Sequence, residues 1–438
     1  MKAIETLAAE MGRFELPPGL RGIPIGTTVT DSAAVKGQGW HPADGAMSLP
    51  LLSLDLPTYA DNKAAMFAVC RAFGCEIAPH AKTPMSPVLA QDLVESGSWG
   101  VSVADLRQAE VMLRHGLRKL LIANEIGGRY AAVRLARLLR AFPRADIHLF
   151  VDSAELVAGL AEAWGEDAGL PPLKLLVEVG CGRGGVNSNA ELDRLLAAIG
   201  DLNEPRISLA GVAAYEGTAN RLVEAELAAA LDDLFARVSY ALKAVRQLVG
   251  AGMPLILSMG GSSLFDHVIT RCRDILDEDG GATLLLRSGA CFFSDNGPIR
   301  ARLGAIVGRG LLGPQVSSRI AGAFKPTLRL WAEVLSANGP NDVICGVGMR
   351  DVAHDQGVPT PLALWRGGKR LAVLGEGAVV MRLNDQHAFV HVPEPAVALG
   401  DVIEFGVNHP CTTIDKHDVI FGLDDKGAVS IVLRTFFG

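Results

Sequence analysis

The stretch "KLLIANEIGGRYAAVRLARLLRAFPRADIHLFVDS", residues 119–153, contains the unit from which the fold can be inferred. Two short apolar runs, 119–125 and 147–153, flank a segment whose apolar residues recur every three or four positions. The runs do not alternate strictly, as is typical of parallel strands covered on both faces. The middle segment has the period of an amphipathic helix and is followed by Pro143. The stretch therefore predicts two parallel strands joined by a helix.

The same alternation repeats through the middle of the chain. Eight apolar runs lie between Glu76 and Gly289, namely "EIAPHAK", "SWGVSV", "KLLIANE", "IHLFVDS", "KLLVEVG", "LAGVAAYEG", "LILSMGG" and "TLLLRSG". Eight strand–helix units are what a (β/α)8 barrel requires, although a doubly wound open sheet would give a similar alternation. Beyond about residue 300, segments such as "LRLWAEVLSA" and "AVSIVLRTFFG" read as strands separated by turn residues.

We therefore predict an α/β protein with two domains. A (β/α)8 TIM-type barrel occupies residues 46–300, and a mostly β C-terminal domain occupies residues 301–438. Residues 1–45 form an N-terminal extension, and an early strand near 48–56 is a candidate to join the β domain. A chain of 438 residues is long enough for two such cores.

Composition limits the class of protein and of partner. The net charge of -7 argues against nucleic acid or an anionic membrane as the main partner. The seven cysteines are odd in number and show no CxxC spacing, which favours reduced thiols in a cytosol-like compartment. The sequence has no apolar run long enough to span a bilayer and no signal-type N-terminus. We expect a soluble, cytoplasmic protein.

Polar residues follow several of the predicted strands. Counting along the chain puts Lys82 after the first strand, Asn124 after the third, Arg183 after the fifth and Tyr215 after the sixth. In a (β/α)8 barrel the catalytic groups lie at these C-terminal ends. A lysine at a strand end is also common as a solvated residue, so its position alone does not establish a role.

The run "SMGGSSLFD" follows the seventh strand, where barrels commonly bind phosphate. Gly260, Gly261, Ser262 and Ser263 could offer backbone N–H groups and hydroxyls to an anion, although such a run is also typical of a flexible turn. A phosphate-binding loop opposite Lys82 predicts pyridoxal phosphate, held by the lysine as a Schiff base.

Seven motifs now stand in a fixed order: "APHAKTPMSP", "LLIANEIGG", "VEVGCGRGGVNS", "AAYEG", "SMGGSS", "LRSGACFFSDNG" and "NHPC". In this order they resemble the D-serine dehydratase and D-threonine aldolase group, pyridoxal-phosphate enzymes of the alanine-racemase-like fold type. The resemblance covers about residues 45–425. It implies a barrel followed by a β domain, and a homodimer with active sites near the subunit interface.

The resemblance also implies roles for single residues. Lys82 corresponds to the Schiff-base lysine, and Arg183 to the arginine that faces the pyridine nitrogen. A guanidinium there disfavours protonation of the pyridine and weakens the ring as an electron sink. Tyr215 lines the cofactor or stacks near it, and Asn124 joins it and the Gly260–Ser263 loop among the cofactor-binding residues.

A metal site is suggested by "VNHPCTTIDKHD". His409 and Cys411 are ligand types that suit zinc, although an isolated HxC is common by chance. The resemblance implies that the pair holds Zn²⁺, as in the dehydratases, whereas the aldolases carry an aspartate in place of Cys411. Asp415, His417 and Asp418 are either groups that support these ligands or surface residues.

The expected activity is dehydration and deamination of D-serine or a related β-hydroxy D-amino acid, giving a 2-oxo acid and ammonia. Lys82 would take the Cα proton, while Zn²⁺ would act as Lewis acid on the β-hydroxyl. The group commonly reads HxKTHK where this chain has His80–Met85, so the substrate could instead be D-threonine or 3-hydroxyaspartate. The alternatives are a D-threonine aldolase-type retro-aldol enzyme, an amino-acid racemase or, in another class, a non-catalytic pyridoxal-phosphate-binding protein.

Overall fold

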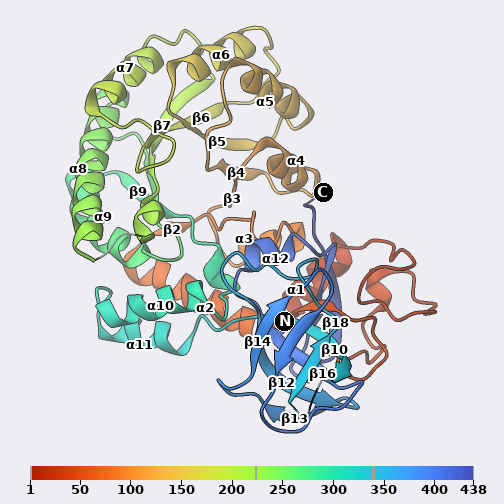
Figure 1. Cartoon of the computed structure of the whole chain (residues 1–438). Helices are drawn as coiled ribbons and strands as arrows, with labels where there is room; N and C mark the ends of the chain where they lie inside the picture. Colours follow the sequence, from red (N-terminus) through yellow and green to blue (C-terminus); the bar gives the residue numbers. More distant parts are fainter. Residues whose placement is uncertain (1, 222–223, 338, 340, 438) are drawn as a thin grey trace.

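The computed structural model describes residues 2–221, 224–337, 339 and 341–437. Figure 1 shows a ring of strands surrounded by helices in the upper part of the view and a β domain in the lower part. The N-terminal segment lies against the β domain, whereas the end of the chain reaches the barrel, where Arg107 donates to Phe436 O at 2.9 Å. The candidate site depends on how these two parts meet.

Eight strands form one parallel sheet in the order β2-β9-β8-β7-β6-β5-β4-β3. They are β2 (Glu76–Ile77), β3 (Val101–Val103), β4 (Lys119–Ile122), β5 (Asp146–Val151), β6 (Leu173–Val179), β7 (Ile207–Ala214), β8 (Leu255–Met259) and β9 (Ala282–Leu286). Each strand overlaps one of the eight predicted runs. The (β/α)8 prediction is therefore confirmed.

The sheet closes between its first two strands through a few backbone hydrogen bonds. The Trp99 N–H donates to Ile77 O at 2.9 Å, and the Ala81 N–H donates to Ser102 O at 2.8 Å. Pro79, between them, has no N–H to donate and interrupts the ladder. For this reason β2 spans only two residues, although the predicted run continues to Lys82.

Seven helices cover the outside of the barrel: α3 (Pro87–Glu95), α4 (Leu106–Arg114), α5 (Arg129–Ala141), α6 (Ala154–Gly165), α7 (Asn189–Gly200), α8 (Glu224–Val249) and α9 (Phe265–Asp279). Short polar side chains fix several of their first turns. Asp105 accepts the Gln108 N–H at 2.8 Å, and Ser188 accepts the Glu191 N–H at 3.2 Å. The interior is filled by Ala78, Leu121, Ala123, Phe150, Leu176, Ala213 and Leu285, so the barrel is a packed core rather than a pore.

The β domain is a ten-stranded sheet system built largely from the end of the chain. Its strands are β1 (Leu51–Asp55), β10 (Leu328–Ala337), β11 (Asp342–Cys345), β12 (Thr360–Arg366), β13 (Lys369–Val373), β14 (Val379–Leu383), β15 (Ala388–His391), β16 (Val402–Gly406), β17 (Val419–Leu423) and β18 (Val429–Arg434). Strand β1 lies between β10, to which it is antiparallel, and β17, to which it is parallel. From β1 the chain enters the barrel through α2 (Leu56–Phe73).

Two further helices, α10 (Pro298–Arg309) and α11 (Pro314–Gly322), separate the barrel from β10. The predicted boundary at residue 300 falls inside α10, so the strand-like region begins only at β10. The amphipathic pattern of these helices is short and each is preceded by glycine, at Gly297 and Gly313. The sequence pattern therefore does not distinguish these helices from the loops around them.

The N-terminal segment packs on the β domain. Helix α1 (Lys2–Glu10) lies against α3 and β18. The His41 ring packs against both Trp331 and Trp365 of the β domain, with ring centroids 5.8 and 5.1 Å away. Among the helices of the described residues, none has both the length and the apolar character needed to cross a membrane.

Candidate active site

A cavity of about 730 Å³ lies at the C-terminal ends of the barrel strands. Most of the predicted site residues line it: Lys82, Asn124, Arg183, Tyr215, Gly261, Ser262, Ser263 and Cys411. Gly260 and His409 do not line the cavity, although a near neighbour of each in the chain does. Gln356 and Cys411 come from the β domain, so the cavity lies where the two domains meet.

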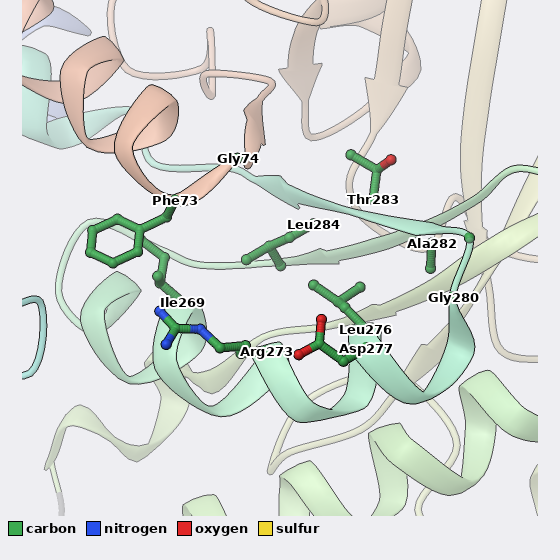
Figure 2. Close-up of a pocket in the computed structure, with 11 residues that line it drawn as sticks. Phe73, Gly74, Ile269, Arg273, Leu276, Asp277, Gly280, Ala282, Thr283 and Leu284 are labelled. Carbon is green, nitrogen blue, oxygen red and sulfur yellow. The ribbon is translucent and has the colours of Figure 1, made fainter.

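A second cavity, of about 560 Å³, lies at the other end of the barrel, where β9 begins. Figure 2 shows Arg273 and Asp277 projecting from α9 beneath Leu284 and Thr283 of β9, with Phe73 at one side. None of the predicted site residues lines it. The candidate chemistry is therefore confined to the first cavity.

Lys82 reaches into the first cavity from the segment after β2. Burial lowers the pKa of its amine; nearby Cys411 acts in the opposite direction, and Arg183 and Arg287 lower it further. In the described part of the chain no hydrogen bond or ion pair engages its Nζ atom. An unpaired amine with a lowered pKa is a better nucleophile and base near neutral pH than an ordinary surface lysine.

Arg183 lies in the loop after β6 and is half-exposed to the cavity. Its Nη2 atom is 3.7 Å from Oε1 of the buried Glu178, and its guanidinium carbon is 5.3 Å from the centre of the Tyr215 ring. Burial and the neighbouring Glu125 raise the pKa of Glu178 to about 8. Because Glu178 then tends to hold a proton at neutral pH, Arg183 keeps its positive charge largely uncompensated.

Tyr215 follows β7, and its ring lies near a second arginine. The guanidinium carbon of Arg287 is 6.0 Å from the Tyr215 ring centre. Arg287 is buried and donates from Nη1 to Ser258 O at 2.6 Å and from Nη2 to Ala214 O at 2.8 Å. These bonds hold a permanent cation in a fixed place beside the cavity that it lines.

The Gly–Ser loop after β8 differs from the prediction in one respect. The Gly260 N–H donates to Oε2 of Glu216 at 3.1 Å, and the Gly261 N–H donates to Oε1 at 2.7 Å. The prediction that these two N–H groups are free for an anion is therefore wrong, because a buried carboxylate already accepts both. Ser262 and Ser263 line the cavity at the N-terminus of α9, whose dipole favours an anion.

His409 and Cys411 lie at the start of the short helix α12 (Pro410–Ile414). His409 Nδ1 is 2.6 Å from Oδ2 of Asp355, and Cys411 Sγ is 3.2 Å from Oγ1 of Thr83. Hydrogen bonds with Cys411 and Asp355 outweigh burial and raise the pKa of His409 to about 9. Burial would raise the pKa of the Cys411 thiol, but its bonds with His409 and Thr83 and the Lys82 charge lower it overall.

Asp415, His417 and Asp418 do not belong to this site. None of the three lines the cavity. The buried His417 ring bonds through Nε2 to the backbone oxygen of Asp351 at 2.8 Å, and Asp415 and Asp418 are exposed. Of the two predicted possibilities, supporting groups or surface residues, the contacts favour a structural or surface position for all three.

Two family models match the chain. The model described as "Alanine racemase, N-terminal domain" matches residues 54–267, and the model described as "Putative serine dehydratase domain" matches residues 327–423. The first match covers the barrel as far as the beginning of α9. The second covers most of the β domain and includes His409 and Cys411.

A curated relative is the D-threonine aldolase of Arthrobacter sp, which is 26% identical over 373 residues, 84% of this chain and 87% of the relative. The structure of D-threonine aldolase from Filomicrobium marinum superposes with a TM-score of 0.71 at 23% identity, covering 96% of this chain and 98% of that one. D-threo-3-hydroxyaspartate dehydratase from Delftia sp. HT23 gives a TM-score of 0.64 at 21% identity, with 89% and 98% covered. These structural likenesses show a shared fold.

Over both of its domains the chain is similar to the D-serine dehydratase and D-threonine aldolase group. This group is part of the alanine-racemase-like family, which depends on pyridoxal phosphate and includes aldolases and dehydratases of D-amino acids. A cysteine-to-alanine mutant of D-threo-3-hydroxyaspartate dehydratase is described in a metal-free form, which implies that this enzyme binds a metal.

The cavity residues fit the cofactor of the group. Lys82 offers an unpaired amine, and a cavity of about 730 Å³ is in the usual range for a small-molecule site. Buried Nδ1 of His80, which lines the same cavity, has no hydrogen-bond partner within the described residues. Burial, with Lys82 and Arg287 adding to its effect, holds the pKa of His80 well below its usual value, so a neutral imidazole faces any ligand.

His409 and Cys411 also fit a metal ion of the kind found in catalytic sites. Asp355 engages Nδ1 of His409 and so fixes the orientation of its ring beside Cys411, and the lowered pKa of Cys411 favours the thiolate that a metal binds. Among the described residues there is no cluster of three or more His, Cys, Asp or Glu side chains able to hold a metal. Two protein ligands would leave coordination positions open for water and substrate.

Three residues of this site, Arg287, His80 and Asp355, were not predicted from the sequence, and they differ in how readily the sequence could have identified them. Arg287 directly follows the eighth predicted strand, so the rule applied to Lys82 and Asn124 could also have found it. His80 precedes Lys82 by two residues near the end of the same predicted run, so the strand-end rule could have found it too. Asp355 is 54 residues from His409, and nothing in the sequence pattern connects the two.

Proposed function

We propose that the protein is a pyridoxal-phosphate-dependent, zinc-assisted dehydratase of D-serine or a related β-hydroxy D-amino acid. The observation that carries the proposal is the contact between Thr83 Oγ1 and Cys411 Sγ at 3.2 Å. It brings the segment of Lys82 together with Cys411, and both Lys82 and Cys411 line one cavity. A base for the Cα proton and a metal for the β-hydroxyl would then act on neighbouring atoms of one substrate.

The cofactor would be held by Lys82 and by the loop at Ser262 and Ser263, and when bound it supplies an electron sink for the negative charge at Cα. Zn²⁺ would be held by His409 and Cys411, and when bound it supplies Lewis acidity to the β-hydroxyl. The Lys82 amine, with its lowered pKa, is the base that takes the Cα proton. That proton and the departing hydroxide would leave together as water, and hydrolysis of the released enamine by one water molecule would then give the 2-oxo acid and ammonia.

Arg183 affects how well the bound cofactor would stabilise the negative charge that forms at Cα. Its guanidinium keeps its charge beside the predicted pyridine position, so protonation of the pyridine is disfavoured and the electron sink is weakened. A weak sink makes assistance at the leaving hydroxyl more important. This favours elimination with metal help over a reaction that relies on a long-lived negative charge at Cα, as racemisation does.

A retro-aldol reaction is the second candidate, because a D-threonine aldolase is 26% identical to this chain over most of its length. In that reaction a base must take the hydroxyl proton, whereas in dehydration an acid must assist the departure of the hydroxyl. The aldolases have an aspartate at the position of Cys411, whereas the dehydratases have a cysteine. Cys411 therefore favours dehydration as the proposed reaction. The neutral His80 ring could supply the base of the alternative.

A product assay decides between the two reactions. With D-serine and added Zn²⁺ we expect release of pyruvate and ammonia, and with 3-hydroxy-D-aspartate the corresponding 2-oxo acid, with little glycine from either substrate. D-Threonine should give 2-oxobutanoate rather than glycine and acetaldehyde. Glycine as the main product would establish the retro-aldol reaction, and conversion of D-serine to L-serine without a keto acid would establish a racemase.

Asp355 offers a test of the metal site that does not depend on activity. Replacing its carboxylate by a neutral amide removes the charged acceptor that lies 2.6 Å from His409 Nδ1, so the ring is held less firmly. We expect Asp355→Asn to weaken Zn²⁺ binding about 10–100-fold, measured by competition with a chromogenic chelator. Asp342→Asn is the matched control, because Asp342 bonds His391 Nδ1 at 2.7 Å away from the cavity. Equal zinc affinity in both variants would contradict the assignment.

A further inference from the structure

Glu216 is a buried acid at the edge of the candidate cofactor site. It follows Tyr215 at the end of β7, and its side chain is fully buried. Both of its carboxylate oxygens accept backbone N–H groups from the next strand end, Gly260 at 3.1 Å and Gly261 at 2.7 Å. One side chain thus joins the loops that follow β7 and β8.

This arrangement is unexpected beside a site for a phosphate dianion. The two N–H groups that it occupies are the ones a phosphate would otherwise bind, and a carboxylate near a phosphate repels it. Arg287 compensates part of this charge, since Glu216 is the acid that most favours its buried guanidinium. Glu216 therefore belongs to a balanced, buried framework beneath the loop and is not itself an anion-binding group.

The groups that remain for an anion lie further along the loop and on α10. Ser262 Oγ accepts the Cys291 N–H at 3.1 Å, and the Ser262 side chain lines the cavity beside Ser263. Arg302 lines the same cavity from α10, and within the described residues its guanidinium has neither an ion pair nor a hydrogen bond. An unpaired, half-buried guanidinium beside serine hydroxyls is well suited to bind phosphate.

We propose that Glu216 is a positioning residue: its carboxylate fixes the Gly260–Gly261 turn so that a phosphate is bound by Ser262, Ser263 and Arg302. The proposal rests on the proposed function, because it takes pyridoxal phosphate as the ligand. It explains why the turn has glycine at both positions. A Cβ atom on Gly261 would lie 2.9 Å from Cε2 of Tyr215, and Gly260 has φ +91°, which side chains disfavour.

The test compares pyridoxal 5'-phosphate with pyridoxal, which lacks the phosphate, on the apoprotein by absorbance titration. We expect Glu216→Gln to weaken binding of pyridoxal 5'-phosphate at least tenfold and to change binding of pyridoxal less than twofold. A Gln side chain can accept only one of the two N–H groups and turns its own NH₂ toward the other, so the turn must shift. Arg302→Ala should give the same phosphate-specific loss, since it removes a direct contact.

Glu204→Gln is the matched control. Glu204 is also a buried acid, but it pairs with Arg206 before β7, at the other end of that strand. It should lower the melting temperature as much as Glu216→Gln does while leaving both ligand affinities unchanged. If Glu216→Gln acted only through a general loss of stability, it would weaken the binding of both ligands in parallel, and this result would overturn the proposal.

The remaining outcomes are equally decisive. Unchanged or tighter binding of pyridoxal 5'-phosphate in either Glu216→Gln or Arg302→Ala overturns the proposal while leaving the proposed function intact. A wild-type protein that binds neither ligand overturns both. If Glu216→Gln does not fold, Glu216→Asp keeps the charge but shortens the reach, and an affinity for the phosphate ligand equal to that of the wild type would count against the positioning role.

Discussion

Lys82→Ala is expected to give a colourless protein whose turnover is lowered by more than about 10⁴-fold. The variant loses the amine that would hold the cofactor and also the base for the Cα proton, and a general base alone contributes about 10²–10⁴-fold. The measurements are the absorbance spectrum after incubation with pyridoxal phosphate and the rate of keto-acid release.

Lys119→Ala is the control for this variant. Lys119 is also a partly buried lysine with a pKa lowered by burial, but it lies at the start of β4 and its Nζ is 4.1 Å from the Trp99 ring centre. It should retain colour and activity. A Lys82→Ala protein that still carries a chromophore reducible by borohydride would show that another amine holds the cofactor.

The second large effect is expected from the His–Cys pair. His409→Ala and Cys411→Ala should each keep the cofactor, because Lys82 and the serine loop belong to the barrel, yet lose bound zinc and about 10²–10⁴-fold in turnover. Zinc content by elemental analysis and keto-acid release are the two readouts. Loss of the Lewis acid removes several kcal/mol of help to the departing hydroxyl.

His391→Ala is the matched control, because His391 also bonds a carboxylate through Nδ1, at 2.7 Å, but lies on β15 away from the cavity. It should have wild-type zinc content and rate. Full activity of the Cys411 variant, or of the wild-type protein after chelation, would show that the pair takes no part in the reaction. A protein acid would then have to protonate the hydroxyl, and the racemase alternative would gain weight.

The parts of this fold that the sequence could predict are those set by local pattern. Each barrel strand reads as a short apolar run, and a parallel barrel puts the residues after those runs on one rim, so Lys82, Arg183 and Tyr215 could be assigned to one cavity. The same counting rule applies to Arg287, which was not named although it follows the last run.

The parts that could not be predicted depend on contacts between distant segments. The amides of Gly260 and Gly261 looked free in the sequence, but Glu216, 44 and 45 residues earlier, accepts both. Asp355 reaches His409 only because the β domain folds its loop against α12. A tertiary hydrogen bond leaves no periodic trace in the chain, so neither partner could be identified in advance.

Strand β1 has a consequence for how this protein is made and engineered. Leu51, Leu52 and Leu54 are fully buried between β10 and β17, which the ribosome synthesises only after the whole barrel. Until then the nascent chain carries an unpaired apolar strand edge, the kind of segment that chaperones bind and that aggregates. A fragment that ends after the barrel would keep this exposed edge permanently. Exchange of the β domain between relatives would therefore have to transfer residues 51–55 together with the C-terminal strands.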